Sequence, residues 1–297
     1  MIPVSYRYPW TLSSEQDRRA VLKDLADNGV RRLVLGSNII EDLIIHPGQL
    51  FVYRKELAEY GLTLMDAHAP WGTWQDLGMP LERYHEDIIL REKMAIRICG
   101  ELGITSLAFH TGNTFNSVFG KDLKLDDYYA MLIRSMEELL PTAEKAGVIL
   151  CLENQWTPLN QSAYLLKAME YFNSPNMGIC YDSGHAHLCE CGEADPEKSC
   201  VPYIWNDIGL PVVWETDMVS KFQPWVVNCH FHDNHGFDDE HNLPGNGTID
   251  WEHVVGVLAK APRLQCIQSE VKMPENGLPV AQMRDVFRKI SFGHLDV

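Results

Sequence analysis

The stretch VILCLE, residues 148–153, joins a run of apolar residues to a single terminal carboxylate. MGICYD (177–182) repeats this arrangement, and runs of similar length occur at 2–6, 32–36, 62–68, 106–110, 226–231 and 265–270. Short runs that are rich in apolar and β-branched residues predict buried strands. The chain therefore contains eight strand candidates, and most of them end in an ionisable residue.

Segments with helical periodicity separate these strands. The clearest is 13–29, which Gly29 ends, and the others are 81–103, 125–147 and 278–290. Pro141 is expected to bend or interrupt its helix. Eight alternating units in 297 residues, compared with roughly 250 in a typical barrel, favour an α/β fold with a single (β/α)₈ TIM barrel. We expect one domain over 1–297 and keep a doubly wound open sheet as the rival.

The sixth unit lacks a clean helix, so we expect an irregular loop region at about 189–225 that acts as a lid or an oligomer contact. This region holds three of the eight cysteines, Cys189, Cys191 and Cys200. Because no second paired-cysteine element accompanies them, free thiols are favoured over a structural metal clip. The other five lie in apolar runs and are expected to be reduced core residues: Cys99, Cys151, Cys180, Cys229 and Cys266.

The formal net charge of −16 opposes the binding of polyanions. No run of about 18 apolar residues predicts a membrane helix. The start MIPVSYRYPW lacks the basic and apolar segments of a signal peptide. We therefore expect a soluble, cytoplasmic protein without a membrane partner, and composition leaves a homo-oligomer open.

Ionisable side chains mark the predicted carboxyl ends of six strands, where barrel enzymes place their active sites. They are His68, His110, Glu153, Asp182, His230 and Glu270. Buried carboxylates that meet in a small space repel each other and take up protons unless a cation compensates them. A divalent metal is the simplest compensation.

Neighbouring stretches extend this cluster. YDSGHAHL contributes His185, and DDEHNLPGNGTIDW contributes Asp239 and His241. His232 is expected on the same face as His230, as a support for it or a substrate contact, and Asp233 is a candidate to orient His230. Three tryptophans follow the first, third and fifth strands and are candidate substrate-binding walls: Trp10, Trp71 and Trp156.

Seven stretches between 66 and 271 resemble, in order, motifs of the xylose isomerase-like barrels: DAHAPWG, LAFHTGN, LCLENQ, ICYDSGHAH, CHFHDN, HNLPGNGTIDW and QSEV. That superfamily includes sugar-phosphate isomerases and epimerases and the apurinic endonuclease family 2. The resemblance implies a metal bound by Glu153, Asp182, His230 and Glu270, with the two glutamates as catalytic acid and base. It also implies that five further residues match the positions that complete a three-zinc site in the endonuclease branch: His68, His110, His185, Asp239 and His241.

Charge favours the isomerase and epimerase branch. Residues 181–250 contain thirteen Asp or Glu but only two Lys or Arg, whereas DNA binding depends on cations that neutralise phosphates. Nucleic acid is therefore the disfavoured partner, and a small carbohydrate is the expected substrate. One departure is that epimerases usually carry an arginine near the PG.G loop, where this chain has His241.

We expect a metal-dependent sugar or sugar-phosphate isomerase or epimerase that transfers a proton through a metal-stabilised enediolate. Three oxygen donors and one nitrogen favour Mn²⁺, with Mg²⁺ or Zn²⁺ as alternatives. Lys272 is a candidate contact for a substrate phosphate. The alternatives are an apurinic endonuclease-like trinuclear zinc phosphodiesterase, a dehydratase of a cyclic polyol acid and a catalytically silent, metal-stabilised sugar-binding protein.

Overall fold

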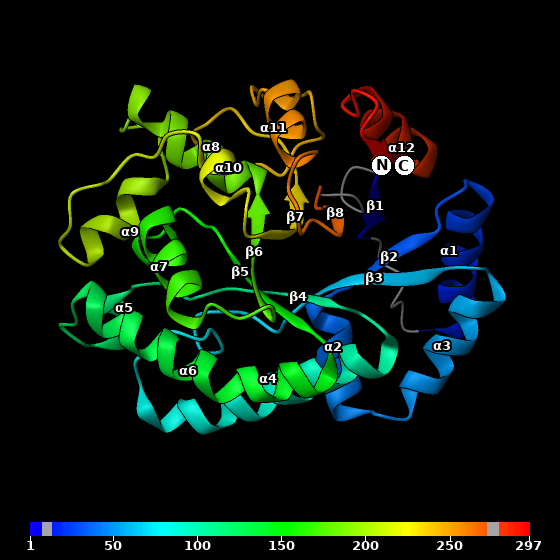
Figure 1. Cartoon of the computed structure of the whole chain (residues 1–297), viewed down its shortest axis with the longest axis horizontal. Helices are drawn as coiled ribbons and strands as arrows, with labels where there is room; N and C mark the ends of the chain where they lie inside the picture. Colours follow the sequence, from blue (N-terminus) through cyan, green and yellow to red (C-terminus); the bar gives the residue numbers. More distant parts are fainter. Residues whose placement is uncertain (8–13, 272–278) are drawn as a thin grey trace.

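Eight parallel strands form a closed ring in the computed structural model, which describes residues 1–7, 14–271 and 279–297 (Figure 1). Each strand pairs with the next, and β1 pairs with both β8 and β2, which closes the barrel. The strands are β1 (Ile2–Tyr6), β2 (Arg32–Leu35), β3 (Thr63–His68), β4 (Ser106–Phe109), β5 (Ile149–Glu153), β6 (Met177–Asp182), β7 (Val226–Phe231) and β8 (Cys266–Ser269). The predicted (β/α)₈ barrel is confirmed, and the open sheet is excluded.

Helices connect the strands and cover the outside of the barrel (Figure 1). They are α1 (Glu15–Asp27), α2 (Ser37–Ile45), α3 (Gln49–Glu59), α4 (Glu82–Leu102), α5 (Asn116–Phe119), α6 (Leu125–Ala146), α7 (Ser162–Phe172), α8 (Ser183–Cys191), α9 (Val201–Asp207), α10 (Met218–Phe222), α11 (Trp251–Leu258) and α12 (Val280–Lys289). Gly103 and Gly147 end α4 and α6 at φ of 76° and 70°, a left-handed conformation that glycine adopts without a steric penalty. No helix in the described ranges is long and apolar enough to cross a membrane.

The structure corrects two expectations about local structure in part. α6 continues without interruption through Pro141. Proline has no N–H to donate to the Glu137 carbonyl. Because Pro141 and Glu137 are both exposed, this carbonyl faces water and not the core. The region 189–225 was expected to be an irregular loop; it contains the end of α8 together with α9 and α10, which irregular segments connect. These helices are short, and for this reason their apolar periodicity is weak in the sequence.

A ninth strand, β9 (Leu295–Asp296), was not predicted. It pairs in parallel with the start of β1, Ile2 opposite Leu295, so the two chain ends lie side by side (Figure 1). The Asp296 carboxylate also forms an ion pair with Arg32 at the start of β2. Two residues are too few for a recognisable strand pattern, so only the pairing reveals this element.

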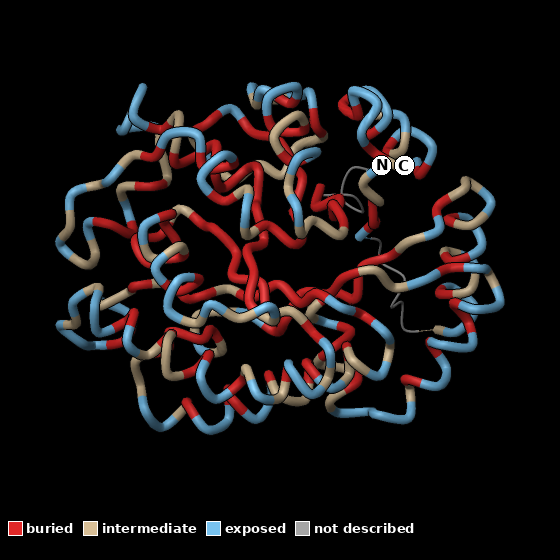
Figure 2. The backbone as a smooth tube through the Cα atoms, viewed as in Figure 1, coloured by how far each residue is buried: buried red, intermediate tan, exposed pale blue. Residues whose placement is uncertain are grey.

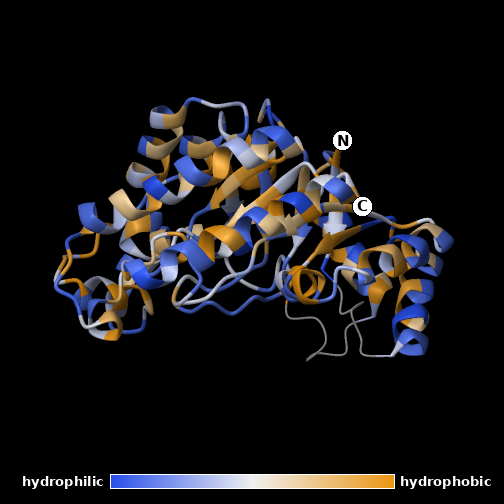
Figure 3. Ribbon diagram, turned by 90° about the horizontal axis from the view of Figure 1, so that it is seen from below, coloured by the Kyte–Doolittle hydropathy of each residue, from blue (hydrophilic) through white to orange (hydrophobic). Residues whose placement is uncertain are grey.

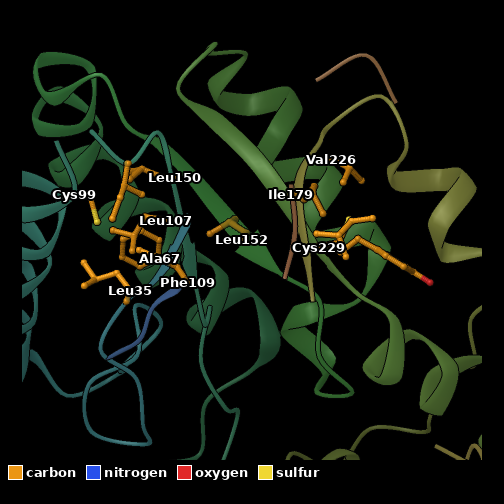
Figure 4. Close-up of a cluster of buried hydrophobic side chains, with 14 of the residues drawn as sticks. Leu35, Ala67, Cys99, Leu107, Phe109, Leu150, Leu152, Ile179, Val226 and Cys229 are labelled. Atoms are coloured by element: carbon orange, nitrogen blue, oxygen red, sulfur yellow. The ribbon is translucent and has the colours of Figure 1, made fainter. Parts of the chain in front are cut away.

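Alternating side chains divide the core into two layers. Leu107, Leu150 and Leu152 point outward and join the main cluster under the helices, which also includes Cys99 of α4 (Figure 4). The intervening side chains form a separate, smaller cluster inside the barrel: Ala108, Cys151, Cys180 and Val227. The buried strands and the half-exposed helices are visible in Figure 2, and Figure 3 shows the apolar strands between helices of mixed polarity.

All eight cysteines are free, as expected. The five in apolar runs are buried, and Cys189 is buried as well, whereas Cys191 and Cys200 are partly exposed. None of the groups that could hold a metal within the described residues includes a cysteine.

Two neighbouring arginines of α1 pair with two glutamates of α3 in different environments. Arg18 and Glu56 are buried, with the Arg18 Nη2 atom 2.8 Å from Glu56 Oε1. Arg19 pairs with Glu59 at 2.6 Å, where both side chains are substantially exposed. The two pairs offer a matched comparison of buried and exposed ion pairs on the same helices.

We predict that Arg18→Met lowers the free energy of unfolding by about 3–5 kcal/mol, because it leaves the Glu56 carboxylate buried without its partner. Arg19→Met is the control and should cost less than about 1 kcal/mol, since water screens the exposed pair. Urea denaturation followed by circular dichroism measures both. Equal losses in the two variants would contradict this interpretation.

Candidate metal centre

The strand ends deliver the predicted residues to one place because parallel strands end on the same side of the barrel. Glu153 and Asp182 are the last residues of β5 and β6, and Asp182 lies opposite His230 in the register between β6 and β7. Glu270 directly follows β8. The period of two along each strand turns all four side chains inward.

These four residues form the first of three groups that could hold a metal ion. Glu153, Asp182, His230 and Glu270 each offer one ligand atom, and these atoms all lie within 4.8 Å of one another. His230 Nδ1 is 2.9 Å from Glu270 Oε2 and 3.4 Å from Glu153 Oε1. All four residues are buried, and Glu270 is the most exposed at 7%.

A second group adjoins the first and shares two of its residues. It consists of His68, Glu153 and His230, with His68 Nε2 3.3 Å from Glu153 Oε2. His68 Nδ1 lies 2.8 Å from the Ala69 carbonyl oxygen, so it is the protonated nitrogen and leaves Nε2 free as a ligand. His110 lies next to this group, with Nε2 3.5 Å from Glu153 Oε2.

The third group comprises His185, His232, Asp239 and His241. His241 Nδ1 donates to the Glu270 carbonyl oxygen at 2.6 Å, which directs Nε2 toward Asp239 Oδ2 at 3.1 Å. The His232 ring stacks on the His241 ring at a centroid distance of 3.8 Å. The structure thus brings together all nine residues implied by the resemblance and adds His232.

His232 is fully buried, and its Nε2 lies 3.1 Å from Asp182 Oδ2. Because His232 is buried beside Asp182, it is placed to orient Asp182 and not to contact the substrate directly. Its place depends on Gly184 of α8, because an ideal Cβ there would lie 2.0 Å from His232 Cε1.

The orphaned polar atoms of the cluster fit a divalent cation. Glu153 Oε2, both ring nitrogens of His230 and Asp239 Oδ1 are buried and make no well-directed hydrogen bond among the described residues, although His230 Nδ1 faces Glu270 Oε2 at 2.9 Å and Glu153 Oε2 faces His68 Nε2 at 3.3 Å. Buried polar atoms in native proteins almost always have a partner, so several such atoms aimed at one space indicate a missing ligand. Carboxylate oxygens and imidazole nitrogens are the donors that Mn²⁺ and Zn²⁺ use.

Without an ion, protons and carboxylates compensate each other across the cluster. Burial opposes the charged form of His185 and His230, yet Asp182 and Asp239 raise the pKa of His185, and Cys180 together with Glu270 and Glu153 raises that of His230, in both cases well above the ordinary value. Burial likewise opposes the ionised form of Glu153, but His230 and His110 hold its pKa well below the usual range. Burial lowers the pKa of His110 itself to about 3.

Two residues near the centre were missed by the sequence analysis. Asp66 lies two positions before His68 on β3, so it points into the barrel, where burial raises its pKa to about 6. The alternation of DAH in β3 was the available signal for Asp66. Arg7 follows β1, and its Nη1 donates to Glu270 Oε1 at 2.7 Å. A partner 263 positions away leaves no local signal in the sequence.

The remaining predicted residues occupy different places. The Trp71 ring lies 5.1 Å from His110 and is 49% exposed, and the Trp156 ring lies 4.9 Å from His185. Trp10 and Lys272 lie outside the described residues. The expectation that Asp233 orients His230 was wrong, because its oxygens accept from the backbone of the 234–249 loop and from Trp251 Nε1.

We predict that binding of a divalent ion releases protons at pH 7. The raised pKa values of His185 and His230 mean that these imidazoles carry protons above pH 6.5, whereas a metal binds only neutral imidazole. The apparent affinity should therefore rise with pH. Calorimetric titration in two buffers with different protonation enthalpies measures the release, and identical heats in both would contradict it.

We also predict that Gly184→Ala weakens metal binding by about tenfold to hundredfold, because the new methyl group displaces His232 from Asp182 and His241. Gly256→Ala in α11 is the control, since no atom lies within 4 Å of its ideal Cβ. Competition with a chromophoric chelator compares the two affinities. An unchanged affinity in Gly184→Ala would remove His232 from the centre.

Comparison with known proteins places this geometry in a family. The family described as xylose isomerase-like TIM barrel matches residues 45–290. The chain is 25% identical over 173 residues to the uncharacterized protein y4fM of Sinorhizobium fredii, and the match spans 56% of this chain but 47% of that protein, about half of its length.

Among solved structures, a D-tagatose 3-epimerase-like protein superposes with a TM-score of 0.72 at 17% identity, covering 98% of this chain and 97% of the other. The IOLI protein with a bound zinc atom superposes with a TM-score of 0.69 at 18% identity, covering 99% and 97%. Similarity at this level of identity establishes the shared fold, and the family match covers most of the chain. The chain belongs to the xylose isomerase-like TIM barrel family.

Proposed function

We propose that the protein is a divalent-metal-dependent sugar or sugar-phosphate isomerase or epimerase that acts by proton transfer. The observation that carries this proposal is that two glutamates, Glu153 and Glu270, both face His230 Nδ1 in one group of possible ligands. Solved structures of similar fold that are named as epimerases support the same reaction class.

Glu153, Asp182, His230 and Glu270 would hold the ion. When bound, the ion supplies positive charge that stabilises an enediolate and acidifies the carbon next to a substrate carbonyl. This group alone suits Mn²⁺, whereas the imidazoles of the adjoining groups suit Zn²⁺. The donor set is therefore compatible with either ion.

The two glutamates would divide the proton transfer. One carboxylate takes the proton from the substrate carbon and becomes a carboxylic acid, and the C–H electron pair moves into the enediolate. The other glutamate, which enters the reaction as a carboxylic acid, donates its proton to carbon and becomes the carboxylate. Return to the opposite face of the same carbon gives an epimer, and return to the neighbouring carbon gives an isomer.

The walls of the site suit a small carbohydrate. Trp71 and Trp156 adjoin His110 and His185 at the edge of the metal groups. Indole rings pack against the C–H faces of sugars, which leaves the hydroxyl groups for His185 and His241. Trp10 and Lys272 stay predicted contacts, Lys272 for a substrate phosphate.

We predict that Glu153→Gln and Glu270→Gln each reduce solvent-deuterium incorporation into a substrate sugar by about 10²–10⁴-fold, because an amide cannot carry the transferred proton. The matched control is Glu240→Gln, which removes the exposed pair with His235 in the neighbouring loop and should leave exchange intact. NMR of a panel of keto- and aldo-sugars, with and without phosphate, measures the exchange. Full exchange in either glutamate variant would exclude that residue from proton transfer.

A second candidate, an apurinic endonuclease-like phosphodiesterase with three zinc ions, is favoured by one observation. The second and third groups adjoin the first and each could hold a further ion, although the second shares Glu153 and His230 with the first. The acidic surroundings of the site oppose DNA binding, so the epimerase or isomerase ranks first.

Elemental analysis of protein purified without a chelator or histidine tag separates the two candidates. One ion per chain supports the isomerase or epimerase. Three zinc ions, together with nicking of abasic duplex that falls steeply with salt, would support the phosphodiesterase. Saturable sugar binding without deuterium exchange or nicking would instead indicate a sugar-binding protein.

A further inference from the structure

Arg7 stands beside Glu270 because of the strand register at the point where the barrel closes. β1 and β8 pair in parallel, with Ser5 opposite Gln268 and Tyr6 opposite Ser269. Arg7 directly follows β1 and Glu270 directly follows β8, so these two residues lie next to each other. Their contact links the ends of β1 and β8 at the metal centre.

The two oxygens of Glu270 have different partners. Oε1 accepts from Arg7 Nη1 at 2.7 Å, whereas Oε2 faces His230 Nδ1 at 2.9 Å. The Arg7 side chain is 45% exposed and that of Glu270 is 7% exposed, so Oε1 lies on the open side of the centre. Each oxygen thus points in a defined direction.

The other carboxylates of the centre lack a comparable partner. Within the described ranges, the ion pairs of Glu153, Asp182 and Asp239 are all with histidines. Glu153 in particular is 1% exposed and has four imidazoles within 3.5 Å. The two glutamates are therefore not equivalent, since Glu270 alone pairs with a permanent cation.

We propose that Arg7 is a positioning residue for Glu270: it holds Oε1 on the substrate side, so that Oε2 alone faces the ion. The proposal rests on the proposed function. A carboxylate that binds an ion through one oxygen keeps the other for proton exchange, and a rigid guanidinium fork holds that oxygen better than a flexible ammonium. Without Arg7, nothing in this contact prevents Glu270 from turning both oxygens toward the ion.

The test uses Co²⁺ as a spectroscopic probe and needs no substrate. Arg7→Met should bind the same number of ions as the wild type but show a weaker visible absorption, since a second Glu270 oxygen raises the coordination number. Added guanidinium ion should restore the wild-type spectrum, and Arg7→Lys should lie between the two. In the deuterium-exchange assay, Arg7→Met should lose about tenfold to hundredfold in rate.

Arg32→Met is the matched control, because Arg32 pairs with Asp296 at the opposite end of the strands. It should keep the wild-type spectrum. A wild-type spectrum in Arg7→Met, or a change that guanidinium fails to reverse and that Arg32→Met reproduces, would overturn the positioning role alone. A wild-type protein that binds no Co²⁺ would overturn the proposed function and this role together.

Discussion

Closure of the parallel sheet is the constraint on which the site depends. β1 bonds to both β2 and β8, and this double pairing turns an open row of strands into a ring. In a closed parallel ring all carboxyl ends face one side, and alternate side chains point to the centre. Glu153, Asp182 and His230 thus meet although they come from three different strands.

Closure also brings buried carboxylates close together, and imidazoles and one guanidinium offset their mutual repulsion. The carboxylates of the centre are largely removed from water, where like charges repel strongly. Histidines contact all of them, and Arg7 adds a fixed positive charge at the open side of Glu270. Asp66 also points into the barrel, and burial raises its pKa to about 6 because this effect exceeds the opposing effects of Ser5, His230 and His68.

The region 189–225 supports the site from outside the barrel. Trp205 of α9 donates from Nε1 to the Trp156 carbonyl oxygen at 3.0 Å, and Asp207 accepts from the Ser117 amide at 3.1 Å. Leu188, Val201 and Trp205 form a small apolar cluster of their own. These contacts tie the region to the loops after β4 and β5, and they fix the backbone of Trp156 next to His185.

The sequence by itself determined the strands and their polar ends. Short apolar runs such as VILCLE and MGICYD end in a carboxylate, so the fold and the four-residue group followed from local pattern together with resemblance to a family. Tertiary structure alone decided which groups of possible ligands share residues, how His232 stacks on His241, and that Arg7 pairs with Glu270. The physical reason is the distance along the chain. The hydrophobic pattern of a strand lies within a few neighbouring residues, whereas these contacts form only when closure of the barrel brings distant strands together.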